Sequence, residues 1–288
     1  MKTKAKKKID IFKKAKGNSK NLKSRFKQVN DNCSNQSRLQ DFRGVIDDGW
    51  GFSVNMHSKA LMGFLESGKL KNIYDIIRDE LGDTANVNDF DRRLEERLKG
   101  YYALRKEFDA IFDKSERFKY GSLYIAGLGA AKYGPFCIIL KKDIIKSRSS
   151  VAFIKSDSLN CYVRAGRIDS GLLCKDTADR GHVSLLAAVK HGENLDSDST
   201  RWYYMICNRD DYIEAITTDD ISIDHIDKIV IDAQARGSVY LDMVDKHEGD
   251  IDDVSKLGEV SETEDFESLM ELIESKGIVI EVYSENGY

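Results

Sequence analysis

Apolar residues first recur with regular spacing at about residue 49. Gly49 to Val54 has the composition of a short strand entered through glycines. Residues 59–66 place apolar side chains at positions i, i+3 and i+4, which predicts a helix with one buried face, and Gly68 is suited to end it. A longer stripe of Leu, Tyr and Phe predicts that most of 89–114 is helical as well.

From Tyr120 onward the pattern changes to short apolar runs typical of strands. An amphipathic helix over 265–276, ended by Gly277, and a last strand over 278–283 are expected near the end of the chain. Because helices precede strands without regular βαβ alternation, the pattern favours an α+β fold over a doubly wound sheet. The strands expected between these helical regions are 121–126, 135–141, 150–154, 160–164, 202–207, 212–217 and 226–231.

Composition narrows the class of protein. The chain has 288 residues, of which 41% are hydrophobic, and this suffices for a core in one large domain or two small ones. It has no run of about 18 apolar residues and no apolar stretch behind its lysine-rich N-terminus. We therefore expect neither a membrane-spanning helix nor a secretory signal. Five cysteines without a CxxC pair argue against disulfides and structural zinc, and favour a reducing, cytoplasmic location.

The small net charge of −4 conceals a strong asymmetry. Residues 1–28 carry twelve lysines and arginines and one acid, whereas residues 242–265 carry ten acids and two lysines. We therefore divide the chain into a basic N-terminal arm, residues 1–48, which can be partly disordered, and a globular domain, residues 49–288. Such an arm suits a nucleic acid or an acidic partner surface. A solvated tail, or a tail folded onto the acidic segment of its own chain, is the alternative.

Generic catalytic motifs are missing from the sequence. It contains no GxxxxGK[ST], HExxH, GxSxG or GxGxxG. The glycine-rich segment 127–131 lacks a third glycine, and we interpret it as a turn. None of the five histidines is paired at metal-ligand spacing, so we expect no metal site. Composition and periodicity alone therefore indicate an α+β domain with a basic arm.

Three segments carry a more specific pattern. Residues 61–72, LMGFLESGKLKN, combine a helix, a glycine turn and a lysine-rich stretch, and residues 133–160 contain a YG-x-apolar-LK strand, an Arg-Ser-rich step and a DSL step. Residues 211–231, DYIEAITTDDISIDHIDKIVI, place a glutamate ahead of an apolar strand. In this order, over about residues 50–283, they resemble the mono-ADP-ribosyltransferase family in the form found in bacterial and phage-associated toxin domains.

The resemblance implies a split β-sandwich with N-terminal helices, and NAD as the donor of ADP-ribose. It also implies that Glu214 is the catalytic carboxylate, which holds the ribose and stabilises the oxocarbenium-like transition state as nicotinamide leaves. Tyr212, Glu214 and Ile216 share one face of a strand, and a glutamate among apolar neighbours is costly unless it is used or paired. A surface glutamate on an edge strand is the alternative.

Other NAD-binding residues are implied by the same resemblance. Arg148 is expected to meet the pyrophosphate, and Ser150 and Ser158 to hydrogen-bond the glutamate or the NAD, with ordinary turn capping as the alternative for both serines. The family carries an arginine or histidine on its first strand. This chain has no arginine there, and His57 is the nearest substitute.

The acceptor is suggested by aromatic and basic residues. Tyr120 or Tyr133 could stack on nicotinamide, although a buried core tyrosine is more common. Arginine-modifying members of the family have an acid two residues before the catalytic glutamate, where this chain has Tyr212. An aromatic residue there, together with residues 1–28, favours a nucleic acid, RNA or DNA, as acceptor.

Biologically, the resemblance suggests a toxin or defence effector that acts in the cell that makes it, and such an enzyme requires a neutralising protein partner. Three other functions stay open. They are transfer to a protein target, hydrolysis of NAD with water as acceptor, and a catalytically inactive copy of the fold that binds nucleic acid.

Overall fold

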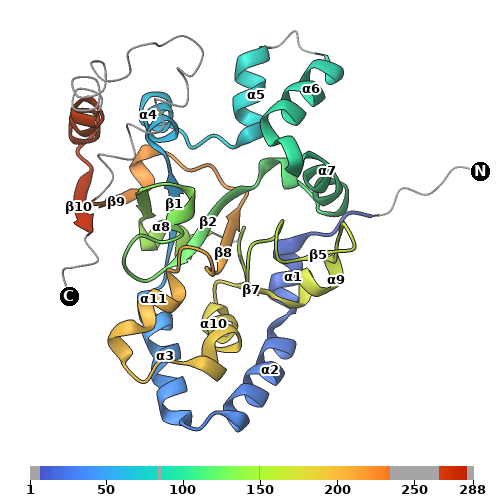
Figure 1. Ribbon diagram of the computed structural model, residues 1–288, viewed down its shortest axis with the longest axis vertical. Helices are drawn as coiled ribbons and strands as arrows, with labels where there is room; N and C mark the ends of the chain where they lie inside the picture. Colours follow the sequence, from blue (N-terminus) through green and yellow to red (C-terminus); the bar gives the residue numbers. More distant parts are fainter. Residues whose placement is uncertain (1–6, 83–85, 149, 234–265, 284–288) are drawn as a thin grey trace, which may run out of the picture.

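The computed structural model describes residues 7–82, 86–148, 150–233 and 266–283 (Figure 1). Its α-helices are α1 (Ile11–Gly17), α2 (Ser19–Asn32), α3 (Gln36–Gly49), α4 (Ser58–Ser67), α5 (Ile73–Leu81), α6 (Val87–Leu98), α7 (Tyr102–Ile111), α8 (Lys142–Ser147), α9 (Ser170–Lys175), α10 (Val183–His191) and α11 (Trp202–Ile206), with a further helix over 266–275. Its strands are β1 (Gly51–Met56), β2 (Lys119–Tyr124), β3 (Phe136–Leu140), β4 (Val151–Ile154), β5 (Val163–Arg164), β6 (Arg167–Ile168), β7 (Thr177–Asp179), β8 (Glu214–Thr217), β9 (Ile226–Asp232) and β10 (Val279–Tyr283).

Within the described residues, eight strands form one sheet in the order β10-β9-β3-β1-β2-β8-β4-β7. Neighbouring strands pair antiparallel except β9 and β10, which pair parallel. The chain is therefore a mixed α/β protein with a large mixed sheet. The sequence predicted a split β-sandwich, but the strand pairing links these eight strands in a single sheet. Figure 1 shows α5, α6 and α7 at one end of the molecule and α2, α3 and α10 at the other.

β1 is shared unevenly by its two neighbours. Residues 51–53 of β1 pair with β2, whereas residues 53–56 pair with β3. The first residues of β2, 119–122, pair with β8 on their other side. The second half of β1 and the first half of β2 therefore diverge, and we call this place the fork, defined by residues 54–56 and 119–121. At its vertex, a Cβ on Gly121 would lie 2.2 Å from the Ser53 carbonyl oxygen, so the close approach requires glycine.

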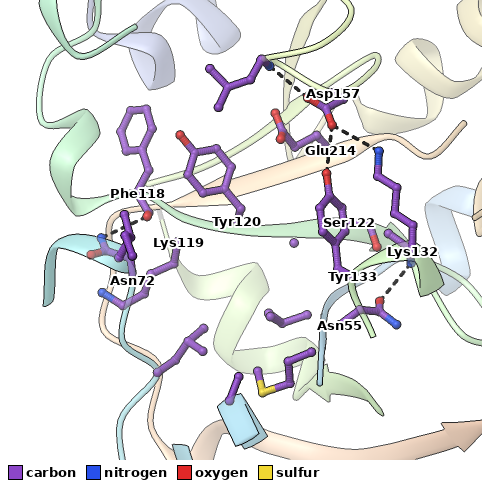
Figure 2. Close-up of a pocket in the computed structure, with 18 of the residues that line it drawn as sticks. Asn55, Asn72, Phe118, Lys119, Tyr120, Ser122, Lys132, Tyr133, Asp157 and Glu214 are labelled. Atoms are coloured by element: carbon purple, nitrogen blue, oxygen red, sulfur yellow. Dashed lines mark hydrogen bonds and ion pairs between the residues drawn. The ribbon is translucent and has the colours of Figure 1, made fainter. Parts of the chain in front are cut away.

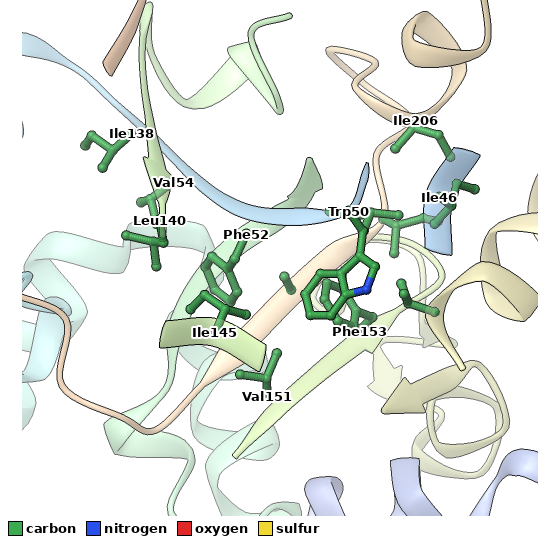
Figure 3. Close-up of a cluster of buried hydrophobic side chains, with 14 of the residues drawn as sticks. Ile46, Trp50, Phe52, Val54, Ile138, Leu140, Ile145, Val151, Phe153 and Ile206 are labelled. Carbon is green, nitrogen blue, oxygen red and sulfur yellow. The ribbon is translucent and has the colours of Figure 1, made fainter. Parts of the chain in front are cut away.

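The main hydrophobic core includes buried side chains of α3, β1, α8 and β4 (Figure 3). The rings of Trp50 and Phe153 meet edge to face, with centroids 5.4 Å apart. Phe52 of β1 and Ile145 of α8 belong to the same buried cluster, as does Ile46 of α3. This packing fixes β1 against β4 and α8, and so anchors the strand from which one wall of the fork extends.

The N-terminal segment is part of this fold. The sequence predicted residues 1–48 as an arm outside the globular domain. From residue 11 onward they instead form α1, α2 and α3, whose apolar faces are buried. Ile11 packs in a cluster with β4 residues, and Leu22 and Phe42 belong to the main core. The acidic segment 242–265 and residues 1–6 lie outside the described residues.

Several predicted elements agree with the structure and others do not. The predicted helix over 59–66 is α4, and its Gly68 is left-handed with φ 72°. The predicted helix over 89–114 is two helices, α6 and α7, and of the predicted strand 160–164 only β5 is extended. The predicted strand 202–207 is wrong, because this segment is α11. Trp202 and Ile206, four residues apart, are both buried, which is helical spacing.

Candidate active site

A cavity of about 790 Å³ opens at the fork. One wall comes from residues 54–57 at the end of β1, and another from residues 118–122 at the start of β2. Helices α5 and α6 and the loops at 130–133 and 157–160 contribute further lining residues. The volume lies within the usual range for sites that hold small molecules and cofactors. Figure 2 shows the polar side chains that gather around it.

Glu214 is the first residue of β8 and lines this cavity. Its side chain is directed to the cavity because Ile213 and Ala215 on the other face belong to the main core. Only 5% of the residue is exposed, and Oε2 accepts a hydrogen bond of 3.1 Å from the Ser158 backbone N–H. Burial and, to a smaller extent, the nearby Asp157 carboxylate raise the pKa of Glu214 to about 8. The free protein therefore holds Glu214 largely protonated at neutral pH.

Asp157 is the ionised neighbour of Glu214 (Figure 2). Its Oδ2 accepts hydrogen bonds from the hydroxyls of Tyr133 at 2.9 Å and Tyr212 at 3.0 Å, and from Lys132 Nζ at 3.3 Å. Burial alone would raise the pKa of Asp157, but these donors and the Asn160 amide hold that pKa below its ordinary value. The two acids therefore carry different protonation states at one site, an arrangement typical of acid–base chemistry.

A second network fixes Tyr120. The Arg105 guanidinium, on α7, is buried and donates from Nη1 to the Tyr120 hydroxyl at 2.6 Å. It also donates from Nη2 to the Ser115 carbonyl at 2.6 Å and from Nε to the Tyr74 hydroxyl at 3.2 Å, and it pairs with Asp109. Burial raises the pKa of Tyr120, so its hydroxyl stays protonated. Tyr120 is thus held in one orientation beside Glu214 on the cavity wall.

The structure brings together most of the residues predicted to act on NAD. Glu214, Tyr120 and His57 all line the cavity. Ser158 holds Glu214, but through its backbone N–H, and its buried hydroxyl has no hydrogen-bond partner in the described part of the chain. Tyr133 also lines the cavity and is 44% exposed.

Arg148 and Ser150 are not among the cavity residues. Arg148 Nη1 donates to the Asp220 carbonyl at 2.9 Å, and Nη2 lies 3.1 Å from His225 Nδ1. The Ser150 hydroxyl bonds to Asp219. Both residues lie before β4, whose far end, Ile154, is the one paired with Glu214. The length of β4 therefore separates them from the site, and the prediction that they contact NAD has no geometric support.

Tyr212 also differs from its predicted role. It is 2% exposed, and its hydroxyl is bonded to Asp157 and, at 2.6 Å, to Tyr133. Its ring is therefore not available as a surface on which a base could stack. In this position Tyr212 instead orders the carboxylate next to Glu214.

Three residues that support the site carry no sequence signal strong enough to find them. Arg105 and Asp109 look like an ordinary i, i+4 ion pair on a charged helix. Asn55, in β1, uses its side chain to hold the loop that carries Tyr133. Its Nδ2 donates to the Leu128 carbonyl at 2.6 Å, and its Oδ1 accepts from the Ala130 N–H at 3.0 Å.

Across the described residues, no group of three or more His, Cys, Asp or Glu side chains is placed to hold a metal ion. The described helices also include none with the length and apolar character that a membrane span requires. Comparison of the chain with models of known protein families finds no match, and comparison with curated proteins finds none either.

Proposed function

We propose that the protein is an NAD-dependent mono-ADP-ribosyltransferase with Glu214 as its catalytic carboxylate. The observation that carries the proposal is the environment of Glu214. It is a buried acid with a raised pKa, held by a backbone N–H beside an ionised Asp157, on the wall of a cavity of nucleotide size. The fork in the sheet supports an ADP-ribosyltransferase-like fold, because it separates strands that an ordinary sheet would pair.

In the proposed reaction the bond between nicotinamide and ribose C1 breaks, and the electron pair leaves with nicotinamide. Positive charge develops on the ribose, and the Glu214 carboxylate stabilises it. An acceptor atom then bonds to C1 and gives its proton to the Glu214 carboxylate. The cationic nicotinamide riboside favours the ionised form of Glu214, so donor binding lowers the pKa of this acid from its value in the free protein.

Other residues have supporting roles. Tyr120, fixed by Arg105, presents an immobile ring to the cavity, where nicotinamide can stack. The Ser158 N–H orients Glu214. His57 lies on the cavity wall at the start of α4, where it takes the place of the first-strand residue of the family.

The acceptor in this proposal is a nucleic acid, RNA or DNA. The lysines of residues 1–28 support it, because α1 and α2 bury their apolar faces and leave their lysines exposed. These include Lys13, Lys14, Lys16, Lys20, Lys23 and Lys27. A fixed helical surface with one sign of charge binds a phosphate backbone more readily than a free tail that must first be ordered. The protein is proposed to act in the cytoplasm as a toxin or defence effector, restrained by an inhibitory protein partner.

The test uses NAD labelled in its ADP-ribose part, a whole-cell extract, the wild-type protein and Glu214→Gln. Label that depends on Glu214 and is removed by nuclease supports transfer to nucleic acid. Label removed by protease instead makes a protein the acceptor, and free ADP-ribose alone makes the enzyme an NAD hydrolase. Folded protein with no Glu214-dependent reaction overturns the proposal and favours an inactive copy of the fold that binds nucleic acid.

A further inference from the structure

The corner between α6 and α7 projects into the same cavity as Glu214. The chain leaves α6 at Leu98, passes through a single 3₁₀ turn over Lys99–Tyr101, and enters α7 at Tyr102. Arg97, Leu98 and Tyr101 from this corner line the cavity. None of them belongs to the Glu214, Asp157 and Arg105 networks described above.

Tyr101 differs from the other tyrosines of the cavity. The hydroxyls of Tyr120 and Tyr133 are hydrogen-bonded, and each ring has a defined contact. The Tyr101 side chain has neither a hydrogen bond nor a ring contact within the described residues, and Tyr101 is 50% exposed. The next residue, Tyr102, packs against the small apolar cluster of α5 and α6. The corner thus packs Tyr102 against the protein and leaves the half-exposed Tyr101 on the cavity wall.

The backbone of the corner is strained in order to do this. Lys99 has φ 47° and ψ −122°, a conformation that residues with a side chain rarely adopt. Strain of this kind persists only where the surrounding structure enforces it, and it concentrates at ligand sites. Here it lies two residues before Tyr101, in the turn that sets the direction of that side chain.

Cationic side chains in the lining of the same cavity suit a phosphate-bearing ligand. Arg97 and Lys71 both line the cavity, and each is paired with an acid of α5, Glu80 and Asp79 respectively. These pairs are partly exposed, so the two acids hold the cations in place at small energetic cost. An aromatic face beside cationic groups is the combination that binds a nucleobase together with its phosphates.

We propose that Tyr101 is the stacking surface for the adenine ring of NAD, with Leu98 beside it and Arg97 and Lys71 near the phosphates. The inference rests on the proposed function, because it places the adenosine half of the donor at one end of the cavity and the scissile nicotinamide–ribose bond at Glu214. It assigns to the α6–α7 corner the selection of a dinucleotide over nicotinamide mononucleotide.

The test measures calorimetric binding of NAD, ADP-ribose and nicotinamide mononucleotide to the full chain. The variants are Tyr101→Ala, Tyr101→Phe and Tyr204→Ala, the last altering another exposed tyrosine, on α11, outside the cavity. We expect Tyr101→Ala to weaken NAD and ADP-ribose binding about tenfold or more, as loss of base stacking does. Mononucleotide binding should stay within twofold. Tyr101→Phe and Tyr204→Ala should match the wild type, since stacking needs only the ring of residue 101.

Two results overturn the adenine site. One is unchanged ADP-ribose binding in Tyr101→Ala. The other is an equal loss of mononucleotide binding, which would indicate general damage to the cavity. If Tyr101→Ala weakens binding of a single-stranded oligonucleotide but not of ADP-ribose, the base comes from the acceptor and the assignment is wrong. Tyr101-dependent binding of ADP-ribose without Glu214-dependent NAD cleavage keeps the site and overturns the proposed function instead.

Discussion

Replacement of Glu214 by glutamine should make the stability of the protein less sensitive to pH. Glutamine has the same shape and its carbonyl can accept the Ser158 N–H, so the change removes the titration and little else. In the folded protein the pKa of Glu214 is about 8, against an ordinary value of 4.5. Between these two values the folded state binds more protons than the unfolded state, so the free energy of unfolding falls as pH rises.

The size of the effect follows from the same numbers. At about 1.4 kcal/mol per pKa unit, a carboxyl raised from 4.5 to about 8 destabilises the folded protein at high pH by at most about 5 kcal/mol. The full effect is present above about pH 8 and is absent below about pH 4.5. Glu214→Gln should therefore gain a few kcal/mol of stability over the wild type between about pH 5 and pH 9.

The assay is urea denaturation followed by circular dichroism at intervals between about pH 5 and pH 9. The quantity of interest is the difference in unfolding free energy between wild type and Glu214→Gln, because the titration of groups that do not interact with Glu214 cancels in it. Glu66→Gln, at an exposed position of α4, is the matched control for replacing a glutamate by glutamine. If the difference in unfolding free energy between wild type and Glu214→Gln does not change with pH, the view that this acid is buried in a poorly solvated site is refuted.

Three further predictions use activity, packing and charge. If the ionised form of Glu214 is catalytic, kcat/KM for NAD should rise with pH along a limb with an apparent pKa near 8, because kcat/KM reports the free enzyme. Gly121→Ala should lower the unfolding free energy, measured by urea denaturation, by about 2–3 kcal/mol, because its Cβ would lie 2.2 Å from the Ser53 carbonyl oxygen. The control is Gly63→Ala in α4, whose Cβ meets nothing within 4 Å and which should be neutral or stabilising. Replacing Lys13, Lys16, Lys20 and Lys23 by Gln should make nucleic-acid binding less dependent on salt. The slope of the logarithm of the binding constant against the logarithm of salt concentration, measured by fluorescence anisotropy, should become shallower by up to about 0.9 for each lysine that contacts a phosphate. Lys142→Gln on α8 should leave this slope unchanged.

The sequence predicted the strand that carries Glu214 because its signal is local, whereas the family resemblance singled out Glu214 itself. An acid at alternate spacing within an apolar strand is visible in four consecutive residues, and burial of Ile213 and Ala215 on the opposite face agrees with it. The environment of Glu214 was not predictable in the same way. Asp157 meets Tyr133 and Tyr212 across 24 and 55 residues of chain, and such contacts depend on the complete fold.

The N-terminal helices show a different limit. Ile11, Ala15, Leu22 and Val29 are spaced at four and seven residues and are all buried, which is the pattern of an amphipathic helix face. The lysines between them dominate the composition and gave the impression of a free basic arm. Long lysine side chains are compatible with a packed helix when the apolar stripe is continuous, because their charges stay in water. Composition therefore obscured a periodic signal that the sequence contained.

The fork and the burial of Glu214 have a common structural origin. If β1 and β2 paired along their full lengths, the continuous sheet would fill the space that the cavity occupies. Ser122 pairs with both β1 and β8, whereas residues 119–121 of β2 pair with β8 and not with β1. The residue of β8 opposite Ser122 is Glu214, which therefore lies at the vertex of the opening. Burying an acid there costs stability at high pH, and core packing around Trp50 and Phe153 offsets that cost. A destabilised carboxylate at the vertex of a preformed cavity is stabilised again by a cationic ligand. The geometry thus favours a substrate whose reacting centre carries positive charge.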